Sequence, residues 1–294
     1  MHCSVLVYIY TIYHIFSSVL PSSSASSPSL SSPSRGRPDR ETGPEKFLRI
    51  AINAKRPFKS DKVFVHSYQE IYGVYLLPFI DRVHAVYDRG FRLFEIGLGC
   101  SSPAKKKGVD VWASLLSDER DSIWVAEVKV KCAQKMIAAG NVPKRVKLVF
   151  GDQANEVDLQ KWQNKTSGRF DAIIDDGSHQ NSHILASLRY LFVNSLSPGG
   201  LYFIEDLQVV RSASHEDTAG AFIFSDVIKD WIEQLVVPPN YTRDRKIKDN
   251  STRPWKHRIL PGIKRISCQY EACVIAKCAD NDVARCSTWG LMIG

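Results

Sequence analysis

The chain has 294 residues and a formal net charge of +8, from 39 Lys and Arg against 31 Asp and Glu. This length provides for one large globular domain plus an extension, and the 44% hydrophobic content excludes a wholly disordered chain. The most basic stretch, RDRKIKDNSTRPWKHR at 243 to 258, contains acids and no recognisable nucleic-acid-binding motif. We therefore interpret it as a solvated loop and expect no nucleic-acid partner.

Residues 1 to 45 differ in composition from the rest of the chain. The apolar run within residues 4 to 20 is shorter than the roughly 20 residues that a spanning helix needs, and no Lys or Arg precedes it. The Ser- and Pro-rich stretch that follows cannot bury a core. We expect a cleaved signal, an anchor or a disordered extension here, with a membrane-anchored or secretory location preferred to the cytoplasm. The folded domain is predicted at 46 to 294.

The seven cysteines are odd in number and form no CxxC pair, so their pattern indicates neither a zinc site nor a full disulfide framework. Cys100 is interpreted as a small loop residue, because no activating base can be assigned to it. N-glycosylation sequons begin at Asn164, Asn240 and Asn250. They matter only if the domain is secreted.

From Phe91 the chain alternates between strand patterns and helix patterns. Helices are predicted at 108 to 116 and 131 to 140, and a turn is predicted at 197 to 200. Strands are predicted at 91–97, 122–128, 146–152, 170–176 and 201–206, and an antiparallel hairpin at 265–277. Strands separated by helices imply right-handed crossovers, so the predicted fold is α/β, with a Rossmann-like, doubly wound, mostly parallel sheet that ends in a hairpin.

Acidic residues stand at the carboxyl end of all five predicted strands. They are Glu95, Glu127, Asp152, Asp175 with Asp176, and Glu205 with Asp206. In open α/β sheets this edge is where ligands bind. Acids at five strand ends out of five therefore predict a common crevice.

The fourth of these strand ends, FDAIIDDGSHQNSH, holds the densest polar chemistry. One interpretation is a helix cap, in which Asp176 or Ser178 bonds the first amides of a helix that starts near Gln180. The other is a functional site. A cap alone explains so many polar residues in one turn less well.

The glycines after the first strand, in Glu95-x-Gly97-x-Gly99, allow a ligand to approach the backbone. A dinucleotide site would place a third glycine where Ser102 stands. Glu127 is suited to accept both hydroxyls of a ribose, in NAD or in an adenosyl ligand. The acid before the glycines favours an adenosyl ligand that carries an amino group.

The order of Glu95-x-Gly97-x-Gly99, Glu127, Gly151-Asp152 and Asp175 resembles the class I S-adenosylmethionine-dependent methyltransferases. DKVFVHSYQEIYGVYL, IIDDGSHQNSH and GGLYFIEDLQ together resemble the branch of macrolide-sugar O-methyltransferases and cephalosporin hydroxylase-like proteins, over roughly residues 60 to 277. The resemblance implies that cofactor-binding residues include Glu95, Gly97, Gly99, Glu127, Asp152, Asp175 and Tyr68. His66, Tyr68 and Tyr72 would lie on a helix over the cofactor pocket, or else be core aromatics of a covering helix.

In that branch the resemblance also implies a divalent metal, usually magnesium, on Asp176, Glu205 and Asp206. Hard carboxylate oxygens suit magnesium, and a cation relieves the repulsion among three acids. His179 falls where the branch places its general base. We expect His183, one helical turn later, to pack beside it or to support it without taking part in the chemistry.

The predicted function is S-adenosylmethionine-dependent, magnesium-assisted O-methyl transfer to a hydroxyl of a small-molecule or glycosylated metabolite. The alternative is a methyltransferase-fold protein that binds a ligand or partner without turnover. A hydroxylase-like activity is disfavoured by the oxygen-only ligand set. Three lysines in the loop at 100 to 108 depart from the branch pattern, and neither the substrate nor the oligomeric state is indicated.

Overall fold

The computed structural model describes residues 41–53, 60–100, 108–215, 222–236, 256–282 and 286. The apolar run within 4 to 20, the lysines of the loop at 101 to 107 and the sequons at Asn240 and Asn250 lie outside these residues. Among the residues that are described, no helix has the length and apolar character needed to span a membrane.

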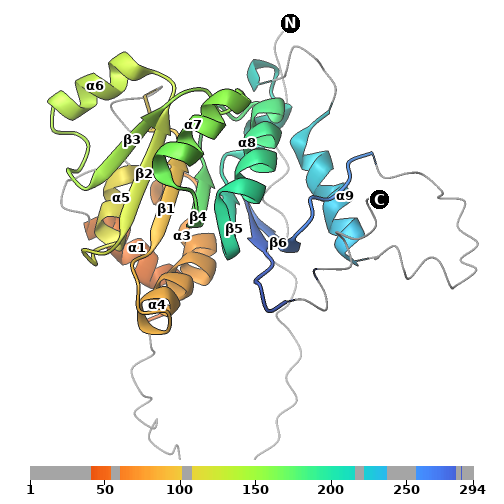
Figure 1. The fold of residues 1–294 in the computed structure, drawn as a ribbon, viewed down its shortest axis with the longest axis horizontal. Helices are drawn as coiled ribbons and strands as arrows, with labels where there is room; N and C mark the ends of the chain where they lie inside the picture. Colours follow the sequence, from red (N-terminus) through yellow and green to blue (C-terminus); the bar gives the residue numbers. More distant parts are fainter. Residues whose placement is uncertain are drawn as a thin grey trace, which may run out of the picture. The chain divides into compact units, whose positions relative to one another are not determined.

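The centre of the domain is a seven-stranded sheet in the order β3-β2-β1-β4-β5-β7-β6 (Figure 1). The strands are β1 (Arg92–Ile96), β2 (Ser122–Glu127), β3 (Val146–Phe150), β4 (Phe170–Asp175), β5 (Leu196–Ile204), β6 (Ile263–Gln269) and β7 (Ala272–Lys277). The first five are parallel, and β7 runs antiparallel to both β5 and β6. The predicted parallel sheet with a C-terminal hairpin is confirmed.

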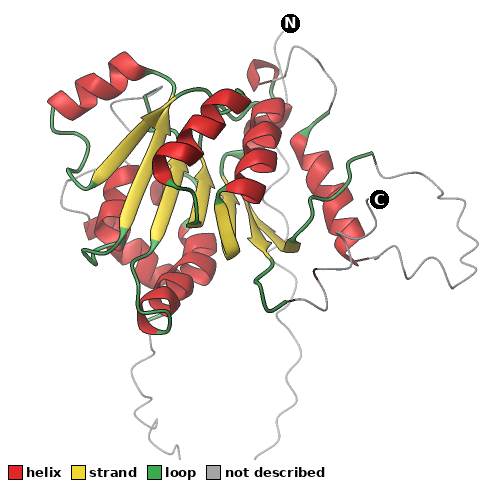
Figure 2. Ribbon diagram, viewed as in Figure 1, coloured by secondary structure: helices red, strands yellow, loops and turns green. Residues whose placement is uncertain are grey.

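Helices cover both faces of this sheet (Figure 2). They are α1 (Gly43–Asn53), α2 (Asp61–Phe64), α3 (Gln69–Ile71), the π-helical turn η1 (Tyr72–Leu76), α4 (Leu77–Ala85), α5 (Gly108–Leu115), α6 (Val130–Ala138), α7 (Glu156–Thr166), α8 (Asn181–Asn194), the 3₁₀ turns η2 (Leu207–Arg211) and η3 (Ala213–His215), and α9 (Phe224–Val236). Helix α1 begins at Gly43, ahead of the domain boundary predicted at Lys46.

Two hydrophobic cores lie on the two faces. In β4, Ala172 and Ile174 join the core under α1, α3, α4, α5 and α6, whereas Ile173 joins the core under α7, α8 and α9. Alternate residues of a strand point to opposite faces, so a strand covered on both sides is apolar throughout. This burial explains why the strands could be recognised as continuous apolar runs.

The turn predicted at 197 to 200 is wrong. These residues belong to β5, which begins at Leu196 opposite Phe170 of β4. The pairing shifts register between Phe170 and Ala172, and Gly199 adopts a φ of +75°. Glycine therefore permits an irregular strand where the sequence indicated a loop.

The expectation that the cysteines form no disulfide framework is also wrong. Among the described residues the structure pairs all six cysteines, as Cys100–Cys132, Cys268–Cys273 and Cys278–Cys286. Cys268 and Cys273 are register partners across the hairpin, and Cys100 meets a cysteine of α6 that is 32 residues away. These proximities come from sheet pairing and loop packing, which cysteine spacing does not reveal. Cys100 is thus a disulfide partner.

Candidate active site

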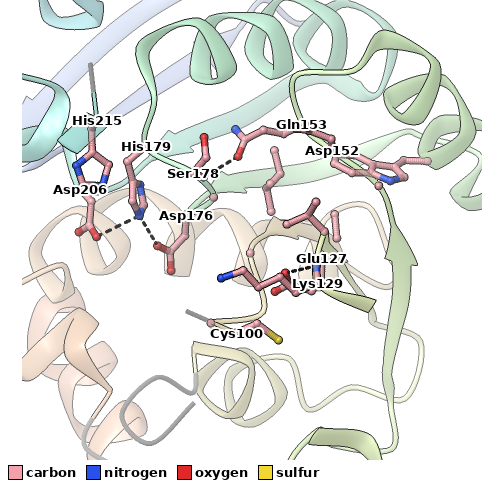
Figure 3. Close-up of a pocket in the computed structure, with 18 of the residues that line it drawn as sticks. Cys100, Glu127, Lys129, Asp152, Gln153, Asp176, Ser178, His179, Asp206 and His215 are labelled. Carbon is pink, nitrogen blue, oxygen red and sulfur yellow. Dashed lines mark hydrogen bonds and ion pairs between the residues drawn. The ribbon is translucent and has the colours of Figure 1, made fainter. Parts of the chain in front are cut away.

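A cavity of about 520 Å³ opens at the carboxyl ends of the parallel strands (Figure 3). It lies where β1 has β2 on one side and β4 on the other, which is the position at which the strand order reverses. Polar residues that line it and were predicted at the site are Glu127, Asp152, Asp176, His179 and Asp206, together with Gly97 and Gly99. The predicted crevice at this edge of the sheet is therefore present.

Glycines shape the floor of this cavity. Gly97 has a φ of +101°, and a Cβ there would lie 2.1 Å from the carbonyl oxygen of Asp176. The amide of Asp176 donates to the carbonyl of Ile96 at 3.1 Å, so the loops after β1 and β4 are in direct backbone contact. Only glycine allows this approach at position 97. A Cβ on Gly177 would meet Oε1 of Gln153, the end of a side chain, so that position is less restricted.

Glu127 ends β2 and holds two loops of the cavity wall. Its Oε2 accepts the amide of Leu98 at 3.1 Å, and its Oε1 accepts the amide of Lys129 at 2.8 Å. A carboxylate has about four lone-pair sites, so each oxygen retains acceptor capacity toward the cavity. Glu127 is thus a fixed, buried acceptor pair in the wall of the cavity, the arrangement that a vicinal diol requires.

Glu95 lies beneath the glycine loop and outside the lining of this cavity. It is 1% exposed, and neither of its oxygens makes a regular hydrogen bond to another described residue. Its nearest cation is Nζ of Lys62, at 3.4 Å. Burial raises the pKa of Glu95 to about 7, against the opposing effect of Lys62. Lys62 therefore balances the charge of Glu95 beneath the glycine loop.

The two aspartates predicted at the cofactor differ in position. Asp152 lines the cavity, and its Oδ1 accepts the amide of Ala154 at 2.9 Å. Asp175 is fully buried behind the cavity wall, where it accepts hydrogen bonds from Ser187 at 2.6 Å, Tyr202 at 3.1 Å and Gln153 at 3.1 Å. Burial raises the pKa of Asp175. In this position it holds Gln153 and does not face the cavity.

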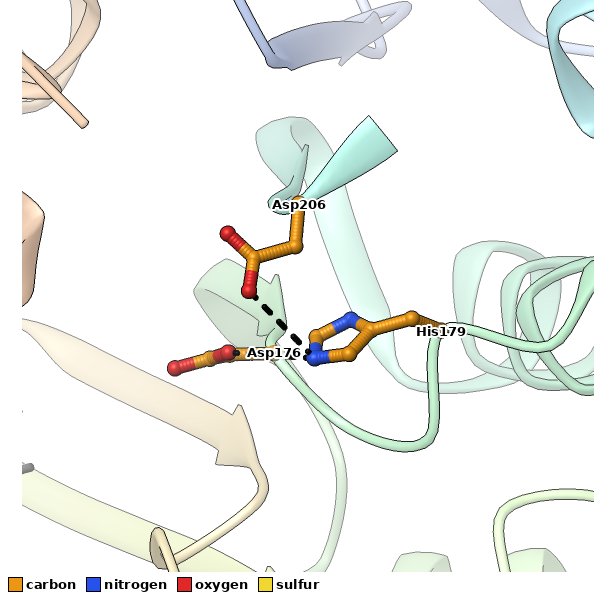
Figure 4. Close-up of side chains that lie close together, drawn as sticks. All are labelled: Asp176, His179 and Asp206. Carbon is orange, nitrogen blue, oxygen red and sulfur yellow. Dashed lines mark ion pairs between the residues drawn. The ribbon is translucent and has the colours of Figure 1, made fainter. Parts of the chain in front are cut away.

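Three polar side chains converge at one end of the cavity (Figure 4). Nε2 of His179 lies 3.8 Å from Oδ1 of Asp176 and 3.5 Å from Oδ2 of Asp206. One ligand atom from each residue lies within 4.8 Å of the others, which fits a small cation with carboxylate ligands. His179 and Asp206 both have positive φ, +59° and +56°. Non-glycine residues hold this conformation at a cost, and such residues cluster at functional sites.

Glu205, the third acid that the resemblance implied for the metal, is 2% exposed and faces away from this cluster. Its Oε2 lies 2.5 Å from Nζ of Lys62, and its Oε1 accepts a hydrogen bond from Tyr72. Lys62 also lies 3.0 Å from Oδ2 of Asp176. Burial alone would lower the pKa of Lys62, but the surrounding carboxylates raise it well above its usual value.

The N-cap residue of α8, Gln180, makes no side-chain capping bond, but Ser178 stabilises the turn before the helix. The Oγ of Ser178 accepts the amide of Gln180 at 3.3 Å and contacts Nδ1 of His183 at 2.9 Å. His183 supports this turn and does not line the cavity. Asp176 caps nothing, because its carboxylate is directed to Lys62 and His179.

Tyr68 lies outside the cavity lining, although it was predicted to contact the cofactor. It is fully buried, and its hydroxyl donates to Oδ1 of Asp206 at 2.8 Å. Tyr72 is buried in the core, where it stacks on Phe47. Both rings therefore fit the alternative that these aromatics belong to the core. Their hydroxyls nevertheless contact the acids after β5, Asp206 for Tyr68 and Glu205 for Tyr72.

Sequence reasoning missed four residues that build the site. Lys62 was missed because lysine is rarely buried. Gln153 was missed because its role comes from its partners: it donates to Asp175, and its Oε1 accepts the amide of Ser178 at 2.8 Å. Lys129 lines the cavity from the loop after β2 and His215 from the 3₁₀ turn η3, and neither stands in a recognisable motif. Only Lys62 stood within a motif of the resemblance, which is the one signal that pointed to it.

No family model matches the chain. It is 28% identical over 199 residues to 8-demethyl-8-alpha-L-rhamnosyl tetracenomycin-C 2'-O-methyltransferase of Streptomyces olivaceus, a match covering 65% of this chain and 48% of that protein. It is 43% identical over 63 residues to mycinamicin VI 2''-O-methyltransferase of Micromonospora griseorubida, covering 21% of this chain and 15% of the relative. The chain thus spans at most about half the length of these relatives.

A solved structure supports the fold. The MycE methyltransferase of the mycinamycin biosynthetic pathway, in complex with Mg, SAH and mycinamycin VI, aligns with a TM-score of 0.55 and 20% identity, covering 80% of this chain and 55% of that one. Together with the strand order, this shows that the domain has the class I methyltransferase fold.

Proposed function

We propose that this protein is an S-adenosylmethionine-dependent, magnesium-assisted O-methyltransferase acting on a hydroxyl of a small-molecule or glycosylated metabolite. One observation carries the proposal: a single cavity is lined by the glycine loop, by Glu127 toward one end and by the Asp176, His179 and Asp206 cluster toward the other (Figure 3). A methyl donor and an acceptor hydroxyl beside a cation would need this arrangement. The names of the curated relatives describe the same type of reaction.

The cofactor end fits an adenosyl ligand. A volume of about 520 Å³ lies within the usual range of small-molecule sites. Glu127 would accept hydrogen bonds from the ribose hydroxyls, and Asp152 would lie near the adenine ring. Gly97 and Gly99 would let the backbone approach the ligand. Glu95 lies beneath the glycine loop, and its negative charge would attract the amino group of the ligand across that loop. Asp175 supports this wall from behind.

The metal end fits magnesium and a base. Asp176 and Asp206 would hold the ion. The resemblance implies Glu205 as a further ligand, but that role would require Glu205 to exchange its contact with Lys62 for the ion. When bound, magnesium supplies positive charge beside the acceptor oxygen, and S-adenosylmethionine supplies the methyl group. His179 is assigned as the general base, and its Nε2 would take the proton of the acceptor hydroxyl. The imidazole lies beside the two aspartates, with Nε2 3.8 Å from Oδ1 of Asp176 and 3.5 Å from Oδ2 of Asp206.

Calorimetric titration of the full-length chain tests the proposal. S-adenosylmethionine and S-adenosylhomocysteine are expected to bind, and magnesium is expected to bind in a separate titration. NAD serves as the competing ligand, because the ribose acceptor Glu127 is compatible with both. Binding of NAD without binding of S-adenosylmethionine would overturn the proposal.

We further propose that the domain matures in the secretory pathway. Three disulfides support this location, because such bonds persist in oxidising compartments. Asn164, which begins one sequon, is exposed on α7 and can carry a glycan. Expression in a eukaryotic host should give a glycosidase-sensitive mobility shift that disappears in Asn164→Gln if Asn164 is the sole acceptor. Unshifted protein with free thiols would contradict the proposal.

A further inference from the structure

Asp206 is held from two sides by one residue of the N-terminal helical segment. The Tyr68 hydroxyl donates to Oδ1 of Asp206 at 2.8 Å and accepts the backbone amide of Asp206 at 2.9 Å. This reciprocal pair spans 138 residues of sequence and lies in the interior, where Tyr68 is 0% exposed. A single hydroxyl therefore fixes both the backbone and the side chain of Asp206.

The fixed backbone is an unusual one. Asp206 has a φ of +56°, at the start of η2 directly after β5. The amide that donates to Tyr68 is the amide of this left-handed residue, so the hydroxyl stabilises a conformation that the chain adopts at a cost. His66 stacks on Tyr68, with ring centroids 5.1 Å apart, and restrains the ring.

The geometry also separates the two carboxylate oxygens of Asp206. Oδ1 faces Tyr68, and Oδ2 lies 3.5 Å from Nε2 of His179 within the cluster. Rotation of the carboxylate would break the hydroxyl bond. Nε2 of His66 also lies 3.6 Å from Oδ1, so the hydroxyl bond from Tyr68 and the neighbouring His66 both favour presenting Oδ2 to the cluster.

We infer that Tyr68 is the positioning residue of the metal site, acting through Asp206 and not through the cofactor. The inference rests on the proposed function, because it takes Asp206 as a metal ligand. Residues that orient metal ligands commonly alter metal affinity by 10- to 100-fold when they are removed. Tyr68 fits this description, since it touches a ligand and does not line the cavity.

The test uses Tyr68→Phe in the full-length chain, which removes one hydroxyl and keeps the ring. We expect the magnesium Kd measured by calorimetry to rise 10- to 100-fold, while the Kd for S-adenosylhomocysteine stays within about twofold. With a methyl acceptor, the magnesium concentration for half-maximal rate should rise by the same factor, and kcat at saturating magnesium should be retained. Tyr190→Phe is the matched control. The Tyr190 hydroxyl donates to Oε1 of Gln163 at 2.8 Å, and Tyr190 does not line the cavity.

A double-mutant cycle shows whether Tyr68 acts through Asp206. The double variant should bind magnesium no more weakly than Asp206→Asn alone. Millimolar magnesium is used as titrant so that weak binding can be measured. Thermal denaturation of each variant identifies any that does not fold. If Tyr68→Phe is unfolded, His66→Ala replaces it, because it removes the ring that stacks on Tyr68 and keeps the Tyr68 hydroxyl; a rise in the magnesium Kd is again expected, and an unchanged Kd would overturn the inference.

The outcomes separate the inference from the proposed function. Unchanged magnesium affinity in Tyr68→Phe, or a loss confined to cofactor affinity, would overturn the inference and leave the function standing. Equal losses in the Asp206→Asn background would also overturn it. If the wild type binds S-adenosylmethionine but no magnesium, both the metal part of the proposed function and the inference are overturned.

Discussion

Glu127 combines two roles in one carboxylate, since it bonds two loop amides and also faces the cavity. Glu127→Ala should weaken S-adenosylmethionine binding by about 1.5–3 kcal/mol, the range for hydrogen bonds to a charged group. Calorimetry measures this change, and Glu233→Ala, which removes an exposed acid from α9, is the control. An unchanged Kd would leave Glu127 with only its role in the loops.

His179 and Asp176 are expected to fail in different ways. His179→Ala should keep cofactor and magnesium binding but lose about 10²- to 10⁴-fold in rate, the usual contribution of a positioned general base. Asp176→Asn should lose magnesium binding, and added magnesium should restore part of the rate. Single-turnover kinetics with and without a chelator check both. Wild-type activity that survives chelation would make these acids structural.

Lys62 is a buried cation among three acids, within 3.4 Å of Glu95, Asp176 and Glu205. Lys62→Met removes the cation and leaves the acids uncompensated, which should lower the free energy of unfolding by about 3–5 kcal/mol. Urea denaturation at neutral pH measures this loss. Because magnesium would replace part of the missing charge, adding it should stabilise the variant more than the wild type. A variant as stable as the wild type would contradict this account.

At the scale of elements, the loops after β1 and β4 are joined at Gly97. Gly97→Ala would place a methyl 2.1 Å from the carbonyl oxygen of Asp176, on a backbone with a φ of +101°. The strained backbone alone costs about 1–3 kcal/mol, and the clash adds to it. We expect a larger loss of stability than this range and no measurable cofactor binding.

Gly140→Ala is the matched control for the β1 loop. Gly140 also has a positive φ, +65°, but a Cβ there meets nothing within 4 Å among the described residues. Only the cost of the left-handed backbone, about 1–2 kcal/mol, should be seen in chemical denaturation. Equal effects of the two substitutions would show that contact with the β4 loop is unimportant.

At the scale of the whole molecule, the disulfides differ in the length of chain that they close. Cys100–Cys132 closes a separation of 32 residues beside the cavity, whereas Cys268–Cys273 closes 5 residues in the hairpin. Replacing Cys100 and Cys132 by serine should cost about 2–4 kcal/mol in urea unfolding, and more than the same change in the hairpin. Equal losses would indicate that loop closure is not the cause.

Much of the molecule could be predicted from sequence because its signals are local. The strands are short apolar runs, since each is covered on both faces, and the acids at their ends lie at one edge because parallel strands share a direction. The positions of Asp176, His179 and Asp206 at one cavity follow from the same rule. The resemblance of three ordered motifs to one methyltransferase branch added the expected chemistry.

The partners of the polar side chains depended on tertiary structure. Tyr68 and Lys62 meet acids more than 100 residues away, and Cys100 meets Cys132 across two loops, because folding of the N-terminal segment and packing of α6 bring them there. Asp175 and Asp176 are adjacent in sequence, yet one supports the cavity wall and the other faces the cluster. Alternation along a strand end sends neighbouring side chains to opposite sides, and only the packed structure shows which side is the cavity.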